Sequence, residues 1–398
     1  MSVSFWQKSA SSEPQKFDYI VVGGGVVGTS AAYWYSRLNP GSHIAIVEAR
    51  TLARGASGRN AGFVLQGTAT DFLTDIEKYG ENRAGKLYRL TVENRNLIES
   101  ELDKDTIRFE PTGSIIAAAT PDENKRLQES IGPLRSAGGR AVHLSASEVN
   151  SRLSSRKFLG ALLVSTGGKV DPVRLVNHIA LESGASIREN SIVEGMEMQG
   201  ANVFVYTGAE LLTAPTVTVA LNAYLPNLFS ELSRYVRPVR AQMLATSPST
   251  GPRLGYPVYS HEGYFYIRQS QSGQLLVGGA RHLHVQEEVG YEDTTTRALQ
   301  NDLEAYIQYY FPDHGYESVE SRWSGVMGFS PDGLPSIGRV PGLVGDQYWA
   351  AGFTGHGMSI GFLFGRILAK LAMGSQPVEA NLFDASRIDV ERRQAASR

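Results

Sequence analysis

Three glycines and one acidic residue near the N-terminus have the types and spacing of a nucleotide site. Gly23, Gly25 and Gly28 form the pattern G-x-G-x-x-G, and Glu48 follows 20 residues after the last of them. In this pattern the glycines permit a tight turn, a close approach of the backbone to a pyrophosphate, and close packing of a helix on a strand. A carboxylate at residue 48 can accept hydrogen bonds from both ribose hydroxyls and would repel a 2′-phosphate. The spacing therefore predicts a site for NAD or FAD and not for NADP.

The segments around these glycines predict the elements that such a site requires. Residues 17–24, FDYIVVGG, predict a buried parallel strand, and residues 25–38 predict a helix rich in small side chains. Residues 43–49, HIAIVEA, predict a second strand, which completes a βαβ unit of about 30 residues. The N–H groups and the partial positive charge at the start of the helix would bind the phosphates.

The segment after the acidic residue distinguishes FAD from NAD. Residues 49–64, ARTLARGASGRNAGFV, form a loop of small residues with the polar side chains of Ser57, Arg59 and Asn60. A simple NAD domain would return to a helix here, whereas such a loop can lie against a pyrophosphate and a flat ring. The apolar end of the segment does not suit an ordinary surface loop.

A glycine-rich turn near the C-terminus also favours a flavin. Gly352, Gly355 and Gly357 precede an apolar helix within residues 348–361. Helix N–H groups aimed at N1 and the C2 oxygen of a flavin would stabilise its anionic reduced form. We therefore expect both ends of the chain to bind one FAD, while the middle of the chain covers the substrate.

The chain contains no linker that would separate consecutive domains, which predicts interleaved domains. The expected fold class is α/β (α+β overall), with a Rossmann-like FAD-binding domain interleaved with an antiparallel-sheet substrate domain. A charged helical pattern covers residues 71–104. The predicted boundaries are 1–16 for an N-terminal arm, 17–80, 150–225 and 323–378 for the FAD-binding domain, 81–149 and 226–322 for the substrate domain, and 379–398 for a charged, peripheral C-terminal tail.

The composition is that of an ordinary globular protein and argues against several kinds of partner. Of the 398 residues, 42% are hydrophobic and 20% are charged, and the formal net charge is −2 with scattered basic residues. We therefore expect neither nucleic acid nor a membrane as a partner, and no apolar run reaches the roughly 18 residues of a membrane span. Cysteine is absent and the N-terminal residues lack the apolar stretch of a secretory signal, so we expect a cytoplasmic location. No metal is expected, because His282 and His284 have no third ligand nearby.

The chain resembles the D-amino-acid-oxidase-type FAD oxidoreductases, the group that includes glycine oxidase and sarcosine oxidase. It is most similar to the γ-glutamylputrescine oxidase-like branch. The motifs follow the family order across about residues 17–375 and read VVGGGVVGTSAA, EARTLARGASGRNAGF, GGKVDPVRLV, ALNAYLP, LLVGGA, RWSGVMGFSPDGLPSIGRV and GFTGHGMSIG. The resemblance implies oxidation of a C–N bond, in which the substrate carbon gives a hydride to flavin N5, water hydrolyses the imine, and O2 reoxidises the flavin to give H2O2.

The resemblance also implies which residues bind the cofactor. Because the chain has no cysteine, and no histidine soon after the ribose-binding acid, FAD is expected to be noncovalent. Glycine oxidase-like members carry a carboxylate-binding arginine near the position of Met327, which places an α-amino acid anchored there in doubt. The expected FAD-binding residues are Gly23, Gly25, Val26, Val27, Gly28, Glu48, Ala49, Arg50, Ser57, Arg59, Asn60, Ala61, Gly62, Val193, Gly325, Gly352, Gly355, His356, Gly357 and Met358.

Candidate substrate contacts come from a predicted hairpin over residues 262–280 and from the C-terminal turn. Tyr264, Tyr266 and Arg268 alternate and would share one strand face, although an exposed or core face fits the same pattern. Arg281 follows the hairpin and could meet an anionic group or form a surface salt bridge. His356 lies between glycines beside a helix start, where it would be close to the flavin.

The leading interpretation is an FAD-dependent amine or amino-acid oxidase that acts on a small molecule and uses O2. One alternative is a dehydrogenase that passes electrons to a quinone or a protein carrier. Another is a flavin-binding structural subunit with little turnover, and a plain NAD dehydrogenase also stays open. The sequence does not define the substrate, its chirality, a catalytic base or the oligomeric state.

Overall fold

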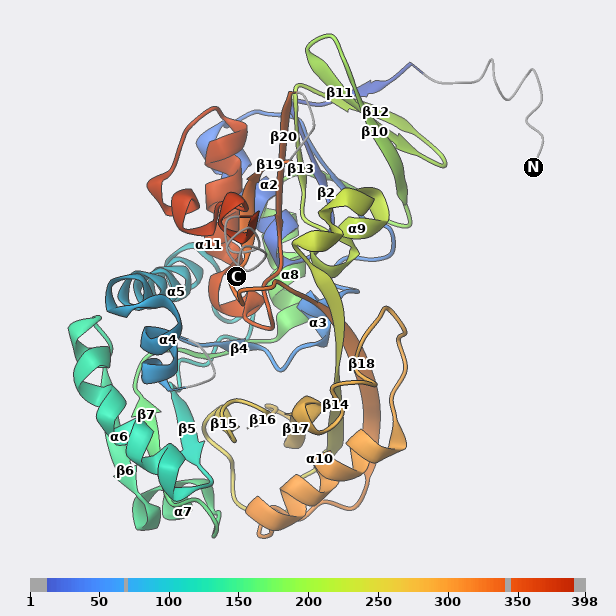
Figure 1. Ribbon diagram of the computed structural model, residues 1–398. Coiled ribbons are helices and arrows are strands. Elements are labelled where there is room, and N and C mark those ends of the chain that lie inside the picture. The colour runs from blue at the N-terminus through green and yellow to red at the C-terminus, as the bar shows by residue number, and fades with distance from the viewer. Residues whose placement is uncertain (1–12, 68–70, 341–344, 390–398) are drawn as a thin grey trace.

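The glycine-rich segment leads into a six-stranded sheet in the computed structural model, which describes residues 13–67, 71–340 and 345–389 (Figure 1). The strand order is β19-β20-β13-β2-β3-β9, and all neighbours are parallel except the antiparallel pair β19 and β20. The strands are β2 (Tyr19–Val22), β3 (Ile44–Val47), β9 (Ser186–Arg188), β13 (Thr216–Val219), β19 (Ser336–Arg339) and β20 (Asp346–Ala351). Segments far apart in the chain thus form one sheet, as the predicted Rossmann-like fold requires.

The six-stranded sheet is covered on both faces, which explains why its central strands β2 and β3 are buried and apolar throughout. Tyr19 and Val21 pack with the core under the helices, whereas Ile20 and Val22 pack on the opposite face with a second, four-stranded sheet. The helices are α2 (Val26–Leu38), α8 (Pro172–Glu182) and α11 (Gly357–Ala372). The four-stranded sheet consists of β1 (Gln15–Lys16), β10 (Val193–Gln199), β11 (Asn202–Thr207) and β12 (Leu211–Ala214).

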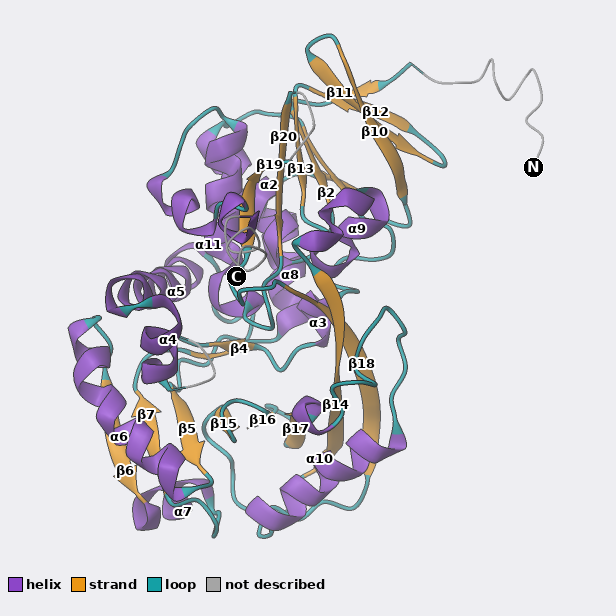
Figure 2. Ribbon diagram, in the orientation of Figure 1, coloured by secondary structure: helices purple, strands orange, loops and turns teal. Residues whose placement is uncertain are grey.

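An eight-stranded sheet forms the other half of the molecule (Figure 2). Its order is β18-β14-β17-β16-β15-β5-β7-β6, and it is antiparallel except for the parallel pair β5 and β15. Its strands are β5 (Ser114–Ala118), β6 (Ala141–Ser145), β7 (Gly160–Val164), β14 (Arg237–Pro248), β15 (Val258–Ser260), β16 (Phe265–Gln269), β17 (Gln274–Gly279) and β18 (Val319–Phe329). Both the expected fold class and the hairpin formed by β16 and β17 are therefore confirmed.

Helices cover one face of the eight-stranded sheet. α7 (Ala146–Leu153) and α10 (Arg297–Tyr310) contribute Val149, Leu299 and Leu303 to a core that also contains Ile115 and Leu244 from the sheet. Residues 150–164 were predicted within the FAD-binding domain, but β7 hydrogen-bonds to β5 and β6 in this sheet. The other domain boundaries stay predictions.

Short elements lie between the two halves (Figure 1). They are α3 (Ala56–Arg59) and a two-stranded sheet of β4 (Phe63–Val64) and β8 (Gly168–Lys169). The remaining helices are α4 (Phe72–Tyr79), α5 (Glu81–Glu101), α6 (Pro121–Ser136), α9 (Leu225–Leu228) and the 3₁₀ turns η1 (Asn222–Tyr224), η2 (Ser230–Arg234), η3 (Arg281–Leu283) and η4 (Val378–Phe383).

The helical pattern predicted over residues 71–104 is present as two helices, α4 and α5. Gly80 ends α4 and precedes α5 with φ +76°, a left-handed backbone conformation that interrupts the helix. The break turns the chain so that α4 can pack beside the cavity described below.

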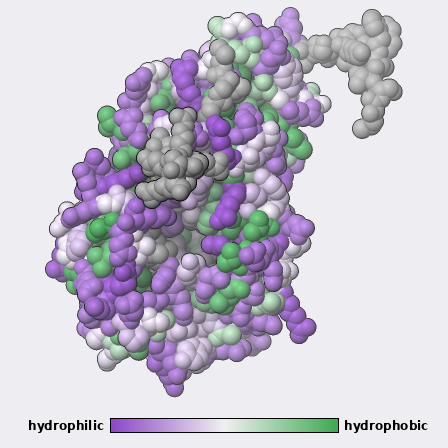
Figure 3. Space-filling view, in the orientation of Figure 1, coloured by the Kyte–Doolittle hydropathy of each residue, from purple (hydrophilic) through white to green (hydrophobic). Residues whose placement is uncertain are grey.

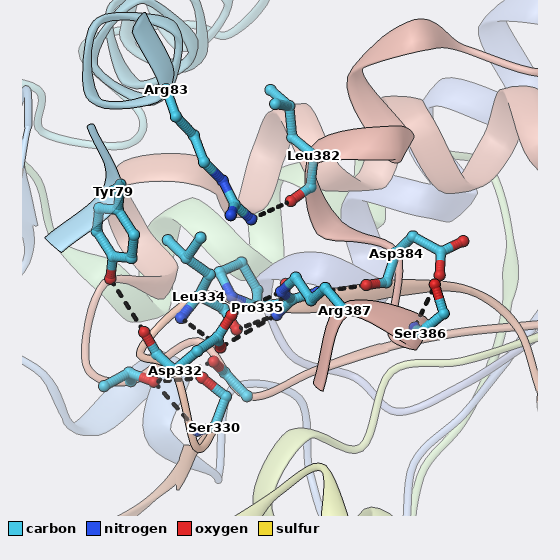
Figure 4. Close-up of polar contacts among 12 residues, drawn as sticks. Tyr79, Arg83, Ser330, Asp332, Leu334, Pro335, Leu382, Asp384, Ser386 and Arg387 are labelled. Carbon is cyan, nitrogen blue, oxygen red and sulfur yellow. Dashed lines mark hydrogen bonds and ion pairs between the residues drawn. The ribbon is translucent and has the colours of Figure 1, made fainter. Parts of the chain in front are cut away.

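The C-terminal segment packs closely on the protein, in contrast to the predicted peripheral tail (Figure 4). Phe383 and Ile388 are buried in the two cores beside the six-stranded sheet. The Arg387 guanidinium bonds to the Asp332 carboxylate at 2.7 Å and to the Leu334 carbonyl at 2.7 Å. The described part of this segment therefore fixes the loop that precedes β19.

The molecular surface in Figure 3 is mainly hydrophilic, with hydrophobic residues interspersed. Within residues 13–67, 71–340 and 345–389, the structure has no helix that combines the length and the apolar character of a membrane span.

Packing of α2 on α11 generates a stability prediction, because these helices join the two ends of the chain. A Cβ atom at Gly365 would lie 2.3 Å from Ser30 Cβ and 2.6 Å from the Ala31 nitrogen. We expect Gly365→Ala to lower the free energy of unfolding by at least about 1–3 kcal/mol, as overpacking does. Urea unfolding followed by circular dichroism measures this change.

Gly85→Ala is the matched control, because Gly85 lies within α5 and its Cβ would meet the flexible tip of Arg89 at 3.4 Å and Ala137 Cβ at an ordinary contact distance of 3.9 Å. Helix propensity favours alanine there by up to about 1 kcal/mol. Equal destabilisation by both substitutions would contradict the packing argument.

Candidate active site

The glycine cradle has the close contacts that the sequence pattern predicts. Gly23 adopts φ +114°, and a Cβ atom there would lie 2.7 Å from the Ala220 carbonyl oxygen. A Cβ at Gly25 would lie 2.9 Å from Ser57 Oγ, and one at Gly28 would lie 1.9 Å from the Gly23 carbonyl oxygen. Side chains at these positions would therefore block the turn between β2 and α2 or the approach of the neighbouring loop.

Glu48 follows β3 and is oriented by backbone N–H groups. Its Oε2 accepts a hydrogen bond from the Gly24 N–H at 2.7 Å, and its Oε1 accepts one from the Arg50 N–H at 2.9 Å. The Ser191 N–H donates to the Glu48 carbonyl oxygen at 2.9 Å, which brings the start of β10, at Val193, to the same edge. The carboxylate thus has a fixed direction and retains acceptor capacity for ribose hydroxyls.

Residues 56–62, here called the bridging loop, make hydrogen bonds to both halves of the molecule. Ser57 Oγ accepts from the Val26 N–H at 2.9 Å, at the N-terminus of α2. Arg59 Nη1 donates to the Ser324 carbonyl oxygen of β18 at 2.8 Å. Gly325 on the same strand leaves the space for this contact, because its Cβ would lie 3.2 Å from Arg59 Cβ.

The turn before α11 has a run of left-handed backbone conformations. Gly352, Thr354 and Gly355 have φ of +79°, +48° and +84°, and Thr354 is not a glycine. His356 is the N-cap residue of α11, whose first N–H groups have no partner within the helix. Burial lowers the pKa of His356; a backbone hydrogen bond at Thr354 acts in the opposite direction, and the nearby Lys78 lowers the pKa further.

A cavity of about 470 Å³ lies where the bridging loop, the turn before α11 and the eight-stranded sheet meet. One of its walls comes from α4 and the loop fixed by the C-terminal segment. The structure places ten of the predicted site residues in its lining: Arg59, Asn60, Ala61, Tyr264, Tyr266, Arg281, Gly325, Gly355, His356 and Met358.

The other predicted FAD-binding residues lie outside the cavity lining. They belong mainly to the cradle, to the edge around Glu48 and to the backbone behind the two loops. They are Gly23, Gly25, Val26, Val27, Gly28, Glu48, Ala49, Arg50, Ser57, Gly62, Val193, Gly352 and Gly357. The contact between Ser57 and α2 joins the cradle to the cavity, an arrangement that suits a two-part ligand such as a dinucleotide.

Arg268 does not line the cavity, so its position does not support the predicted substrate contact. Its side chain is buried, and Nη1 donates to the Ala61 carbonyl oxygen at 2.9 Å and to the Val170 carbonyl oxygen at 2.7 Å. Strand alternation places Arg268 on the face of Tyr266, but it does not reveal that backbone carbonyls occupy this end of the strand.

An aromatic wall of the cavity was missed by the sequence analysis. The rings of Phe63, Tyr259 and Tyr266 lie 5.2–6.2 Å apart and meet edge to face. Tyr259 pairs directly with Tyr266 across β15 and β16, and burial raises the pKa of Tyr266 to about 12. The alternation within residues 257–268 could have indicated Tyr259, whereas Phe63 depends on the contact between the halves.

The position of the cavity, between a nucleotide cradle and a second sheet, is that of a dinucleotide-dependent redox enzyme. Residues 18–371 match the model of the FAD dependent oxidoreductase family (DAO), and the chain belongs to this family. The resemblance inferred from the motifs, the oxidoreductase class and the choice of FAD are therefore confirmed.

Individual relatives agree with this assignment. The chain is 27% identical over 387 residues to gamma-glutamylputrescine oxidoreductase of Escherichia coli, covering 92% of this chain and 85% of the relative. Among solved structures, glycine oxidase from Geobacillus kaustophilus has a TM-score of 0.79 at 21% identity, with 94% of this chain and 98% of that chain covered. L-proline dehydrogenase from P. horikoshii has a TM-score of 0.78 at 21% identity, with 95% and 99% covered. These two structures establish the shared fold.

The residues in the cradle fit FAD by their own geometry. The three glycines leave space that any Cβ would fill, α2 presents N–H groups at its start, and the Glu48 carboxylate is aimed by two backbone donors. These groups would hold the pyrophosphate and the ribose of the adenosine half.

Glu48→Gln tests the assignment of the ribose-binding acid. A neutral amide cannot accept from two hydroxyls and two backbone N–H groups as a carboxylate does. We expect the dissociation constant for FAD to rise about 10-fold or more, since charged hydrogen bonds contribute about 1.5–3 kcal/mol. Titration of the apoprotein with FAD, followed by flavin fluorescence, measures the change. Glu194→Gln on the exposed part of β10 is the control, and the assignment fails if both variants bind FAD as the unchanged protein does.

Proposed function

We propose that the protein oxidises a C–N bond of a small amine or amino acid with FAD as a noncovalent cofactor and O2 as the electron acceptor. The observation that carries this proposal is the cavity, in which the bridging loop and the turn before α11 meet the aromatic wall of the second sheet. The family assignment supports the redox chemistry, and the name of the relative from Escherichia coli supports an amine as substrate.

FAD held by the cradle and the bridging loop would supply a two-electron oxidant whose electrons O2 would take up to give H2O2. The substrate would lose a hydride from the carbon that carries the nitrogen and a proton from the nitrogen, and water would hydrolyse the resulting imine to a carbonyl compound and either ammonia or an amine. A neutral amine needs orientation rather than a strong base for this step.

The cavity lining can supply the orientation. Phe63, Tyr259 and Tyr266 form an apolar wall that excludes water and restricts where the substrate carbon can lie. His356 lies beside this space, and burial lowers its pKa, which favours a neutral imidazole that can accept a hydrogen bond from the substrate. We propose that the ten predicted site residues that line the cavity contact the flavin and the substrate. The cradle residues would contact the adenosine half of FAD.

Arg281 is the proposed contact for an anionic group of the substrate. The preceding residues, Gly279 and Ala280, have φ of +124° and +59°, and this turn directs Arg281 into the cavity. The guanidinium lies over the Phe329 ring at 4.9 Å, and no hydrogen bond or ion pair joins it to another described residue. A carboxylate would satisfy these donors bidentately.

Anaerobic reduction of the bound flavin by a panel of compounds tests the proposed reaction. The panel should contain polyamines, N-methyl amino acids, and D- and L-amino acids. We expect at least one of them to bleach the flavin absorption near 450 nm. If no member bleaches a flavin that dithionite reduces, the protein does not oxidise such C–N bonds, and a structural role for the flavin is favoured.

Reoxidation kinetics distinguish the oxidase from a dehydrogenase. The solved relatives of this fold carry names of both kinds, so the fold leaves the acceptor open. We expect stopped-flow mixing of the reduced protein with air-saturated buffer to restore the flavin spectrum faster than turnover and to release H2O2. Slow reoxidation by O2 with fast reoxidation by a quinone would favour a dehydrogenase.

Arg281→Met tests the proposed anionic contact. We expect KM to rise about 10- to 150-fold for an amine that carries a carboxylate, with little change in kcat, because a charged hydrogen-bond pair is lost. An analogue without the carboxylate should keep its KM. Steady-state kinetics with both substrates measure this difference.

The control is Arg297→Gln, which removes an exposed guanidinium at the start of α10, outside the cavity. An equal change of KM for both substrates in the Arg281 variant would contradict an anion-specific role.

A further inference from the structure

We propose that Arg268 is a positioning residue for FAD, which acts by holding the bridging loop from the side of the eight-stranded sheet. Arg268 lies on β16, outside the cavity lining, whereas the loop carries Ala61 in that lining. The inference concerns cofactor binding, so it does not depend on which substrate the protein oxidises.

One guanidinium nitrogen of Arg268 donates hydrogen bonds to backbone carbonyl oxygens of two chain segments. Nη1 donates to Ala61 at 2.9 Å, to Val170 at 2.7 Å and more weakly to Gly62 at 3.4 Å. The side chain is 6% exposed, so water does not replace these bonds readily. Without the guanidinium, the carbonyl oxygens would be left buried with fewer donors.

Gly62 is adapted to this contact. It adopts φ +70°, and a Cβ atom there would lie 2.3 Å from the Val170 carbonyl oxygen and 2.7 Å from Arg268 Nη1. Its carbonyl oxygen also accepts the Val170 N–H at 2.8 Å. The absence of a side chain at residue 62 therefore makes room for the guanidinium, which is a different role from the flavin contact that the motif implies.

The charge of Arg268 is costly at this position. Burial lowers its pKa to about 10, although the carboxylates of Glu110 and Asp171 act in the opposite direction. Nε has no hydrogen-bond partner in the described chain. The side chain of Lys169 is also buried nearby and pairs with Glu110 at 3.3 Å, and Arg253 pairs with the same carboxylate at 3.8 Å, so Glu110 is shared among three cations. Burying an apolar side chain here would cost less free energy than burying a guanidinium. We therefore infer that Arg268 fixes the position of the bridging loop more than it stabilises the fold.

The side chain of Asn60 connects Gly62 to the start of the bridging loop by hydrogen bonds. Its Oδ1 accepts the Gly62 N–H at 2.7 Å, while its Nδ2 donates to the carbonyl oxygens of Ala56 at 3.0 Å and Ser57 at 2.8 Å. Ser57 in turn bonds to the N-terminus of α2 beside the cradle. A shift of the carbonyls held by Arg268 would therefore move both the cavity side and the cradle side of the loop.

Thermal unfolding with and without FAD, together with FAD titration of the full-length apoprotein, tests this inference. We expect Arg268→Met to raise the dissociation constant for FAD at least 10-fold and to reduce the increase of Tm that FAD causes. Arg268→Lys should restore part of the affinity, because it keeps the charge but loses the planar fork. The absorption bands of the bound flavin should also lose resolution in the Met variant, since the loop no longer packs on the ring.

Arg240→Met is the matched control, because Arg240 is a similarly buried arginine of the same sheet whose guanidinium pairs with Glu288 and, within the described residues, forms no hydrogen bond to the bridging loop. We expect it to lower Tm equally with and without FAD and to leave the dissociation constant within twofold. The same behaviour of Arg268→Met would overturn the inference.

Gly62→Ala disturbs the same contact through the bridging loop instead of through Arg268. This variant tests the inference if Arg268→Met does not fold. Its added Cβ must displace the Arg268 guanidinium or the Val170 carbonyl. We expect a loss of FAD affinity of at least 10-fold in this variant. Unchanged FAD binding by both Gly62→Ala and Arg268→Lys would overturn the inference as well.

Discussion

The structure depends on one constraint, which is that the bridging loop, residues 56–62, must satisfy hydrogen bonds from both halves of the molecule at once. Ser57 caps the N–H of Val26 at the nucleotide cradle, while Arg59 binds the carbonyl of Ser324 on the second sheet. The cavity exists where these contacts meet, because the loop forms part of its wall. Hydrogen bonds made by the seven residues of the bridging loop therefore set the position of the cradle relative to the eight-stranded sheet.

Close helix packing brings the distant ends of the chain to this loop. The indole N–H of Trp34 in α2 donates to the Phe362 carbonyl of α11 at 3.1 Å, and Gly365 removes the side chain that would separate the two helices. The N-termini of α2 and α11 are thereby brought to the same region of the molecule, although some 330 residues lie between them, and we propose that both contact one FAD. The C-terminal segment also contributes to the cavity wall, because Arg387 bonds to Asp332 and thereby fixes the loop that precedes β19.

Local patterns explain what the sequence predicted well and what it did not. The geometry of the cradle and of Glu48 was predictable, because it follows from turn geometry and spacing within one βαβ unit. The contacts of Arg268 were not predictable, since alternation along a strand defines a face but not the backbone carbonyls that the face meets. The same limit applies to Phe63, whose aromatic partners come from another sheet, and to Phe383, whose burial a charged neighbourhood concealed. The helical pattern over residues 71–104 was predictable, whereas its division into α4 and α5 follows from the left-handed φ of +76° at Gly80.

Hydrogen–deuterium exchange of the full-length protein with and without FAD tests the central claim most directly, because it reports on each segment separately. We expect FAD to slow exchange in three separate peptides, which cover the start of α2, the bridging loop and the start of α11. Protection confined to the start of α2, with unchanged exchange in the bridging loop and at residues 355–360, would contradict it. In that case the cradle would bind a nucleotide, but the loop would not join it to the cavity.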